Sequence, residues 1–308
     1  MTAKLWFGLG TLVAGFFGIG LWLWTPVRSR SALEQKYLAR DTDMVEIAGT
    51  RLHVRDTGEQ QAEAVVLVHG LGSSLHTWDD WSQALEQHFR VIRLDLPGSG
   101  LSPPDRNTDY SDTRSIELLL ALMDQRGIER ASFVGNSIGG RIAWSLAAAH
   151  PERVSKLVLV APDGFESPGY EYGKPAKVPT LLQAMRYVLP KSMLRSNIAI
   201  AYADPTALSD ATLDRYYELM LGPGTRTALL ARMEQTVLSN PQPLLERITS
   251  PVLLLWGEAD AMIPIANAAD YQAALPQSEL VRLPGLGHVP QEEAPDRSVA
   301  PVLAFLTG

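Results

Sequence analysis

Five short and nearly continuous apolar runs set the strongest limit on what this chain can fold into. Each run has the length of one strand, and helix-length stretches separate most of them. Strands that are apolar on both sides are typical of a mostly parallel sheet with helices on both faces. The sequence therefore predicts an α/β fold. The runs are 64–70 (AVVLVHG), 91–98 (VIRLDLPG), 131–137 (ASFVGNS), 154–162 (VSKLVLVAP) and 251–257 (PVLLLWG).

The stretches between these runs show the spacing of amphipathic helices. Residues 115–128 and 138–154 have apolar positions at helical intervals, and residues 43–56 alternate as two short strands would. From Asp163 to about Ser250 the alternation of strand and helix stops, and four stretches with helical spacing follow one another. We interpret this part of the chain as a helical insertion between two strands of the sheet.

The N-terminal region contains an apolar segment long enough to cross a bilayer. Residues 5–24 carry no charge, and as a helix they would span about 30 Å, the thickness of one hydrocarbon core. Trp6 lies near one end and Trp22 near the other, where indole rings favour the membrane interface. The apolar run is long for a cleaved signal peptide. We therefore predict a retained transmembrane anchor over residues 1–27.

Small residues repeat along this segment. Gly10, Ala14 and Gly18 are spaced by four, which lets two helices approach closely, so we predict a homodimer through this face. Residues 28–41 follow, with Leu33 and other apolar side chains on one helical face. We predict a juxtamembrane helix there, with its arginines among lipid headgroups.

Charge is distributed unevenly along the chain. The first 40 residues carry a net charge of +4, whereas the remainder has 22 basic and 33 acidic residues. An acidic body argues against a nucleic-acid partner. The chain has no cysteine, which excludes disulfides and thiolate metal sites, and no cluster of ligands suggests a metal or another cofactor. The basic residues after the apolar segment weakly favour a cytoplasmic body.

A serine occupies the turn between one predicted strand and the helix after it. Gly135-Asn-Ser137-Ile-Gly139 fits the G-x-S-x-G pattern, in which a sharp turn lifts a nucleophilic hydroxyl above the sheet. Glycine is needed because the turn is strained and neighbouring backbone passes close. The alternative is a glycine-rich turn or a phosphate cradle with an incidental serine. We predict that Ser137 is a nucleophile.

Two further residues complete a catalytic constellation. A serine nucleophile needs a base, and His288 lies in a glycine-rich loop after the last predicted strand. The base needs an acidic partner, and Asp260 follows the strand at 251–257. The order Ser, Asp, His is the one expected when a serine turn of this kind carries a triad. Asp163 and Glu258 are weaker candidates for the acid, and His69 is expected to be structural.

Backbone amides supply the remaining catalytic element. HGLG at 69–72 follows the first long apolar run, and the helix after the serine begins at Ile138. The N–H groups of Leu71 and Ile138 are predicted to form an oxyanion hole for the tetrahedral intermediate of acyl transfer.

These motifs resemble the α/β-hydrolase superfamily over roughly residues 43–308. The resemblance implies a core of residues 42–162 and 251–308, with residues 163–250 as a cap or lid. It also implies the triad Ser137, Asp260 and His288 without a cofactor. With the N-terminal segment included, the chain is similar to the membrane-anchored phospholipase A of pseudomonads. That likeness implies an inner-membrane, single-pass protein with a periplasmic catalytic domain.

The main hypothesis is therefore a membrane-anchored serine hydrolase that cleaves carboxylic esters of membrane lipids and releases a fatty acid. Its partners would be the bilayer and the lipid substrate. Three alternatives stay open. GNS turns also resemble those of serine C–C hydrolases that open ring-cleavage products. A carboxylesterase for small esters would use the same residues, and a binding module on this fold is the non-enzymatic alternative.

Overall fold

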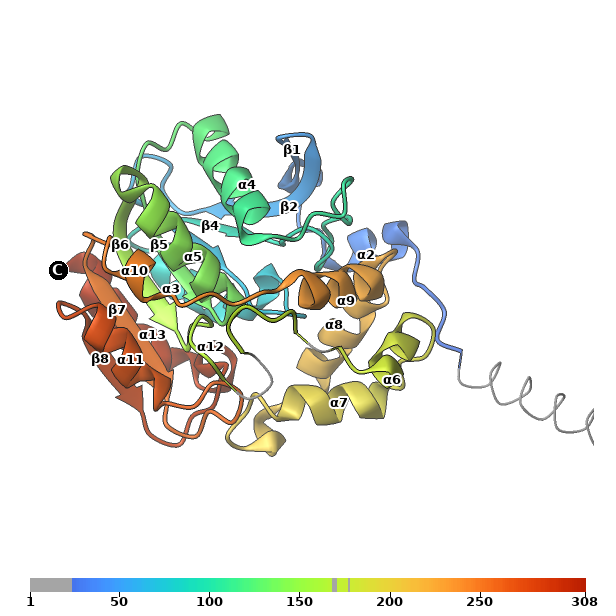
Figure 1. Cartoon of the computed structure of the whole chain (residues 1–308). Helices are drawn as coiled ribbons and strands as arrows, with labels where there is room; N and C mark the ends of the chain where they lie inside the picture. The colour runs from blue at the N-terminus through green and yellow to red at the C-terminus, as the bar shows by residue number, and fades with distance from the viewer. Residues whose placement is uncertain (1–23, 168–170, 177) are drawn as a thin grey trace, which may run out of the picture.

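The computed structural model describes residues 24–308 except 168–170 and 177. Its centre is an eight-stranded sheet in the order β1-β2-β4-β3-β5-β6-β7-β8 (Figure 1). The β1–β2 and β2–β4 pairs are antiparallel and all the others are parallel. The prediction of a mostly parallel sheet is confirmed. The strands are β1 Met44–Ile47, β2 Thr50–Thr57, β3 Ala64–Val68, β4 Arg90–Leu94, β5 Ala131–Asn136, β6 Val154–Val160, β7 Val252–Gly257 and β8 Glu279–Leu283.

Helices cover both faces of this sheet, as the unbroken apolar strands require. Successive residues of β3 alternate between two cores: Val66 packs in the first, with α4 and α5, and Val65 in the second, with α3 and α13. The helices of the first face are α4 Asp112–Gln125, α5 Ile138–Ala149, α10 Gln242–Leu245 and α11 Asn267–Ala274. Those of the second face are α3 Asp79–Leu85, α12 Pro290–Glu293 and α13 Pro295–Thr307.

A helical insertion separates β6 from β7. We call residues 163–250 the cap, after their position beside the carboxyl ends of the central strands (Figure 1). The cap has its own apolar cluster, which includes Leu194, Leu213 and Leu230. Its helices before α10 are α6 Thr180–Gln183, α7 Lys191–Ala199, α8 Asp210–Met220 and α9 Thr225–Gln235, with the 3-10 turns η4 Ala184–Arg186 and η5 Pro205–Ala207. The other 3-10 turns are η1 Asp41–Asp43, η2 Leu75–Trp78 and η3 Pro151–Arg153.

A short helix, α2 Arg30–Tyr37, lies within the predicted juxtamembrane segment 28–41 and packs against the protein (Figure 1). Its buried Leu33 clusters with residues of the core and of α8. Arg28 pairs with Glu218 at 3.4 Å, and Arg30 donates to the Leu101 carbonyl at 2.7 Å. The arginines that we expected among lipid headgroups therefore have partners within the protein.

The predicted membrane location is corrected. Residues 1–23, which hold nearly all of the predicted anchor and the glycines of the proposed dimer face, lie outside the described residues, so the dimer stays a prediction. In the parts that the structure describes, no helix could cross a bilayer. The longest, α4, has 14 residues, which is about 21 Å against a hydrocarbon core of about 30 Å. The single-pass inner-membrane placement with a periplasmic catalytic domain is therefore withdrawn.

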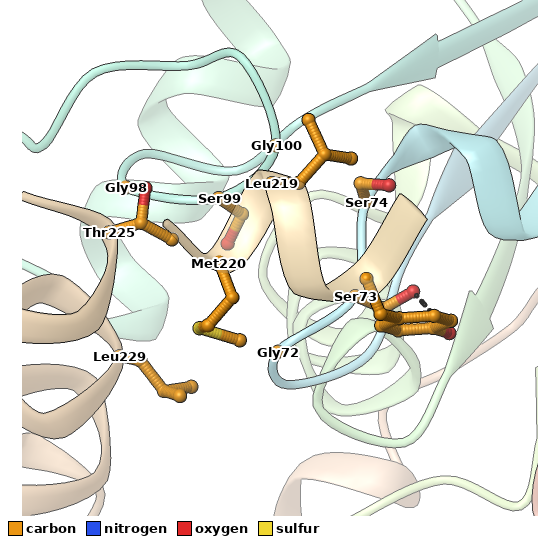
Figure 2. Close-up of a pocket in the computed structure, with 11 residues that line it drawn as sticks. Gly72, Ser73, Ser74, Gly98, Ser99, Gly100, Leu219, Met220, Thr225 and Leu229 are labelled. Carbon is orange, nitrogen blue, oxygen red and sulfur yellow. Dashed lines mark hydrogen bonds between the residues drawn. The ribbon is translucent and has the colours of Figure 1, made fainter. Parts of the chain in front are cut away.

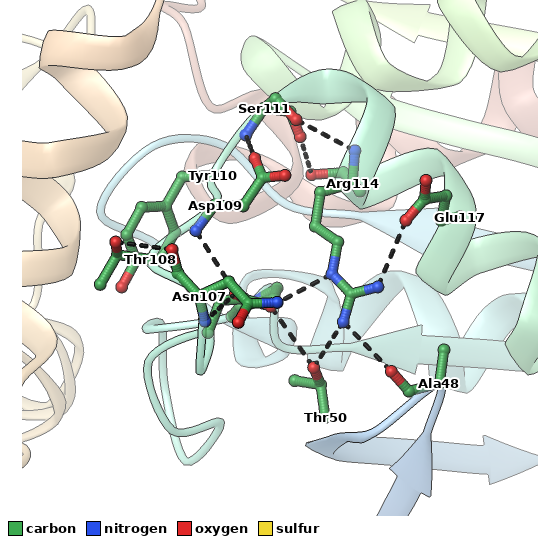
Figure 3. Close-up of polar contacts among 12 residues, drawn as sticks. Ala48, Thr50, Asn107, Thr108, Asp109, Tyr110, Ser111, Arg114 and Glu117 are labelled. Carbon is green, nitrogen blue, oxygen red and sulfur yellow. Dashed lines mark hydrogen bonds and ion pairs between the residues drawn. The ribbon is translucent and has the colours of Figure 1, made fainter.

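Arg114, in the first turn of α4, fastens the β1–β2 hairpin to the rest of the core (Figure 3). Its guanidinium donates to the Ala48 carbonyl at 3.2 Å, to Thr50 Oγ1 at 2.8 Å and to Asp105 Oδ2 at 3.1 Å. The Asp105 side chain is only 1% exposed, so its charge depends on partners within the protein: Arg114, its cation, and the amides of Asn107 and Asp109. Glu117, the fourth contact at 3.3 Å, is solvent-exposed.

Replacing Arg114 by Met should lower the free energy of unfolding by about 2 kcal/mol, because Asp105 would keep a buried carboxylate without its cation. The matched control is Glu117→Gln, which removes only the exposed partner and should cost less than about 0.5 kcal/mol. Urea denaturation of both variants measures the difference, and equal small losses would contradict this role for Arg114.

Candidate functional site

Ser137 lies at the turn between β5 and α5 with a backbone that side chains rarely adopt. Its φ is 55° and its ψ is −122°, a strained combination for a residue with a Cβ atom. The chain is held there by backbone hydrogen bonds on both sides of the turn: the Ser137 amide donates to Val160, and the Ser137 carbonyl accepts from Asp163 and Arg141. Ser137 also lines a cavity.

The glycines around this turn are required by close backbone contacts. A Cβ on Gly135 would come within 2.3 Å of the Gly139 carbonyl oxygen, and a Cβ on Gly139 within 2.2 Å of the Val68 carbonyl oxygen. Neither contact can be relieved by moving a flexible side chain. The pattern in the sequence therefore reflects the tight packing of β3, β5 and α5 under the serine.

His288 and Asp260 come together at the ends of the neighbouring strands. Asp260, after β7, places Oδ2 at 2.7 Å from His288 Nδ1, in the loop after β8. Its other oxygen, Oδ1, accepts from the Met262 and Ile263 amides, so the aspartate shapes its own turn as well. Both Asp260 and His288 are buried, and His288 lines the same cavity as Ser137. Their catalytic roles remain a proposal.

Asn136, whose role we did not predict, connects the serine turn to the histidine loop. Its buried side chain donates to the His288 carbonyl at 3.0 Å and to the Val160 carbonyl at 3.1 Å. The amide of His288 donates in turn to the Ala201 carbonyl of the cap at 2.7 Å. The histidine backbone is thus fixed by the core on one side and by the cap on the other. In the sequence, the only signal for this role of Asn136 is its position next to Ser137.

The predicted oxyanion loop lies directly over the serine turn. A Cβ on Gly70 would be 3.3 Å from Ser137 Cβ, which places the loop against Ser137. His69 fixes the loop: one ring nitrogen contacts the Gly70 carbonyl at 2.7 Å and the other accepts from the Leu96 amide at 3.0 Å. Burial lowers the pKa of His69, which favours the neutral ring that this pairing needs. His69 therefore acts as a structural residue.

The two predicted donors are available in this arrangement. Leu71 lines the cavity beside Ser137, and Ile138 is the first residue of α5. In the backbone hydrogen bonding of the described residues, neither N–H donates to a carbonyl. Free amides at a helix N-terminus favour developing negative charge. An oxyanion hole at Leu71 and Ile138 stays a proposal that this geometry permits.

Asp95, after β4, joins three segments beneath the oxyanion loop. One carboxylate oxygen accepts from the Leu75 amide at 2.7 Å, and the other accepts from the Leu101 amide at 2.8 Å and lies 2.7 Å from His53 Nδ1. Burial by itself would raise the pKa of Asp95, but the charge and hydrogen bond of His53 outweigh it and lower the pKa to about 2. This buried carboxylate fixes where the oxyanion loop returns to the core.

The weaker candidates for the acid have other surroundings. Asp163 is buried and pairs with Arg141 at 2.6 Å rather than with His288. Burial raises the pKa of Asp163 although Arg141 opposes the shift. Glu258 is exposed. In the part of the chain that the structure describes, no three His, Cys, Asp or Glu residues are placed to hold a metal ion.

A cavity of about 290 Å³ lies above Ser137 and His288, between the core and the cap. Its cap wall is mostly apolar, and among the described residues that line the cavity none is Asp, Glu, Lys or Arg. Polar atoms come from Ser73, Asn136, Asn197 and Tyr216 besides Ser137 and His288. The apolar wall includes Leu182, Met185, Leu189, Leu194, Ile198 and Met220.

A second, smaller cavity adjoins the oxyanion loop (Figure 2). It measures about 20 Å³, room for one water molecule, and is lined by two turns rich in glycine and serine, 72–74 and 98–100. Figure 2 shows Ser73 at its edge with Met220 and Leu229 opposite, and these residues also line the larger cavity. The two cavities are therefore neighbours across Ser73.

Known proteins share this architecture. The family described as alpha/beta hydrolase fold matches residues 63–295. The 2-hydroxy-6-oxononadienedioate/2-hydroxy-6-oxononatrienedioate hydrolase of Burkholderia vietnamiensis is 30% identical over 292 residues, which cover 92% of this chain and 98% of the relative.

Solved structures of other hydrolases are also similar to this chain. A meta-cleavage product hydrolase from Pseudomonas fluorescens IP01 has a TM-score of 0.74 and 25% identity, and the match covers 86% of this chain and 97% of that one. A membrane phospholipase A, named a bacterial virulence factor, has a TM-score of 0.72 and 23% identity, and the match covers 100% of this chain and 99% of that one. At that identity the likeness to the phospholipase shows the fold alone.

These names bear on two predictions. The sequence also predicts, as an alternative, a C–C hydrolase of ring-cleavage products. The names of these relatives support this alternative better than lipid ester hydrolysis. Neither hydrolase name mentions the inner-membrane location expected from residues 5–24.

The low pKa of Asp95 makes part of the stability dependent on pH. Because this pKa, about 2, lies below the value of about 4 for an unfolded aspartate, folding favours the charged form. The contribution, about 2 kcal/mol, is complete above pH 4 and is lost as pH falls towards 2. Asp95→Asn should be less stable than the wild type at pH 6, and the gap in urea midpoint should narrow at pH 3. A gap independent of pH would contradict this.

Proposed function

We propose that this chain, a serine hydrolase that belongs to the α/β-hydrolase fold family, cleaves carboxylic esters. The acyl group of these esters would be apolar, as in lipids. The observation that carries this proposal is the cavity above Ser137. Its cap wall is mostly apolar and suits a hydrocarbon chain, and Ser137 and His288 lie on the core side of the same cavity.

The proposed reaction is acyl transfer through Ser137. His288 takes the hydroxyl proton as Oγ attacks the ester carbonyl, and Asp260, at 2.7 Å from Nδ1, holds the imidazole and stabilises its charged form. The proton then passes to the leaving alcohol, and an acyl-enzyme remains on Ser137. Water, deprotonated by His288, hydrolyses this ester and releases a fatty acid.

The oxyanion of the tetrahedral intermediate would be bound by the amides of Leu71 and Ile138. Removing one such donor costs about 3–4 kcal/mol in other serine hydrolases. The loop bearing Leu71 is held by His69 and Asp95 before substrate arrives, so little reorganisation is needed when the charge develops. The same residues would serve small esters, and the length of the preferred acyl chain decides between these substrates.

A second candidate function is C–C bond hydrolysis of a ring-cleavage product, which the relatives' names favour. The substrate in the name of the Burkholderia vietnamiensis relative is a dioate and therefore carries two carboxylates. Binding a dianion in a dry cavity needs cations. Since none lines the described cavity here, the geometry supports the neutral ester better.

Steady-state kinetics separate these functions. We expect turnover of p-nitrophenyl butyrate and octanoate with kcat/KM at least tenfold above that for 2-hydroxy-6-oxononadienedioate, because the cavity offers no counter-charge. Ser137→Ala should lose at least about 1,000-fold in kcat with the fold intact by circular dichroism. His150→Ala is the matched control and should keep wild-type rates, because this half-exposed histidine directly follows α5 and does not line the cavity.

Each alternative has its own outcome. Faster turnover of the dioate would replace the ester function by C–C hydrolysis. Equal ester rates in the wild type and Ser137→Ala would refute the serine mechanism, and no turnover of any substrate would favour the binding module.

A further inference from the structure

A buried carboxylate lies four residues after His288, where the histidine loop enters the short helix α12. Glu292 is 7% exposed and receives three side-chain donors from the cap. Tyr202 donates its hydroxyl at 2.6 Å, and both Tyr216 and Arg215 reach the same oxygen, Oε1, at 3.0 Å. The carboxylate therefore connects the end of the catalytic loop to two separate parts of the cap.

The shared oxygen Oε1 connects the cavity to a cation. Tyr216 lines the cavity, and its hydroxyl also lies 3.2 Å from Ser73 Oγ at the edge of the oxyanion loop. Arg215 does not line the cavity, but its guanidinium and the Tyr216 hydroxyl bind the same oxygen of Glu292, each at 3.0 Å. A positive charge is thus adjacent to the cavity wall and is neutralised there.

The two tyrosines and the arginine around Glu292 each have a raised pKa. Burial, followed by the negative charge of Glu292, raises the pKa of both Tyr202 and Tyr216 well above the usual value. Both phenols therefore remain protonated and donate to the carboxylate. Burial would lower the pKa of Arg215, but the Glu292 carboxylate outweighs it and raises the pKa. The cluster holds one positive and one negative group, so the wall beside Tyr216 is neutral overall.

We propose that Glu292 is a specificity-determining residue: by neutralising Arg215 behind the Tyr216 wall, it makes the cavity accept neutral acyl chains and disfavour chains that end in a carboxylate. This inference rests on the proposed ester hydrolysis and names the substrate class within it. Removing the negative charge would leave Arg215 to attract an acyl carboxylate, and removing the positive charge would leave Glu292 to repel it.

Two esters of equal length test this. The probes are p-nitrophenyl octanoate and the mono-p-nitrophenyl ester of suberic acid, whose eight-carbon chain ends in a carboxylate. The measured quantity is the ratio of kcat/KM for the suberate ester to that for the octanoate ester. In Glu292→Gln the ratio should rise about tenfold. In Arg215→Gln it should fall about tenfold, and in the double variant it should return near the wild-type value.

Glu293→Gln is the matched control. Glu293 accepts backbone amides of Gly287, Ala203 and Asp204 rather than a cation, so its loss should leave the ratio unchanged whatever it does to the rate. If Glu292→Gln fails to fold, the fall of the kcat/KM ratio in Arg215→Gln tests the proposal by itself. Unchanged ratios in an active enzyme would overturn this inference and leave ester hydrolysis standing. A wild type inactive on octanoate would refute both.

Discussion

The left-handed backbone at Ser137 is the constraint on which the rest of the site depends. A residue with a Cβ in such a conformation costs about 1–2 kcal/mol, and it persists only where the surroundings enforce it. Here the enforcement comes from backbone packed against Gly135 and Gly139, where no side chain fits. The same turn begins α5 at Ile138 and brings Gly70 against the serine. The proposed nucleophile and one proposed oxyanion donor, Ile138, therefore lie on this one turn, and the loop that bears Leu71 packs against it.

The histidine is positioned differently, through a loop that contacts core and cap together. Asn136 holds the His288 carbonyl, and the Ala201 carbonyl holds its amide. Gly287 leaves no room for a side chain, because a Cβ there would be 2.5 Å from the Ala201 carbonyl oxygen. The cap thus forms the apolar wall of the cavity and also supports the backbone of the proposed base. A displacement of the cap would change substrate access and the position of His288 at once.

The sequence predicts the sheet well, because the signal for each strand is local. Apolar runs indicate strands, and glycines at fixed spacing around Ser137 indicate a turn. The contact between Arg215 and Glu292 had no such signal, because the two residues are 77 positions apart and each resembles an ordinary surface charge. The role of Asn136 likewise depends on a carbonyl 152 residues away. The predicted membrane location rests on the length and apolarity of residues 5–24 and on the likeness to the membrane-anchored phospholipase A, and this prediction is corrected.

We propose above all that Ser137 is the nucleophile of an apolar acyl site. An alkyl fluorophosphonate with an octyl chain tests it directly, because it phosphonylates an activated serine and its chain needs the apolar cavity. Intact-mass measurement followed by peptide mapping should find one adduct, on the peptide containing Ser137, and none in Ser137→Ala. An adduct on another residue, or a folded wild-type protein that stays unlabelled, would contradict the account.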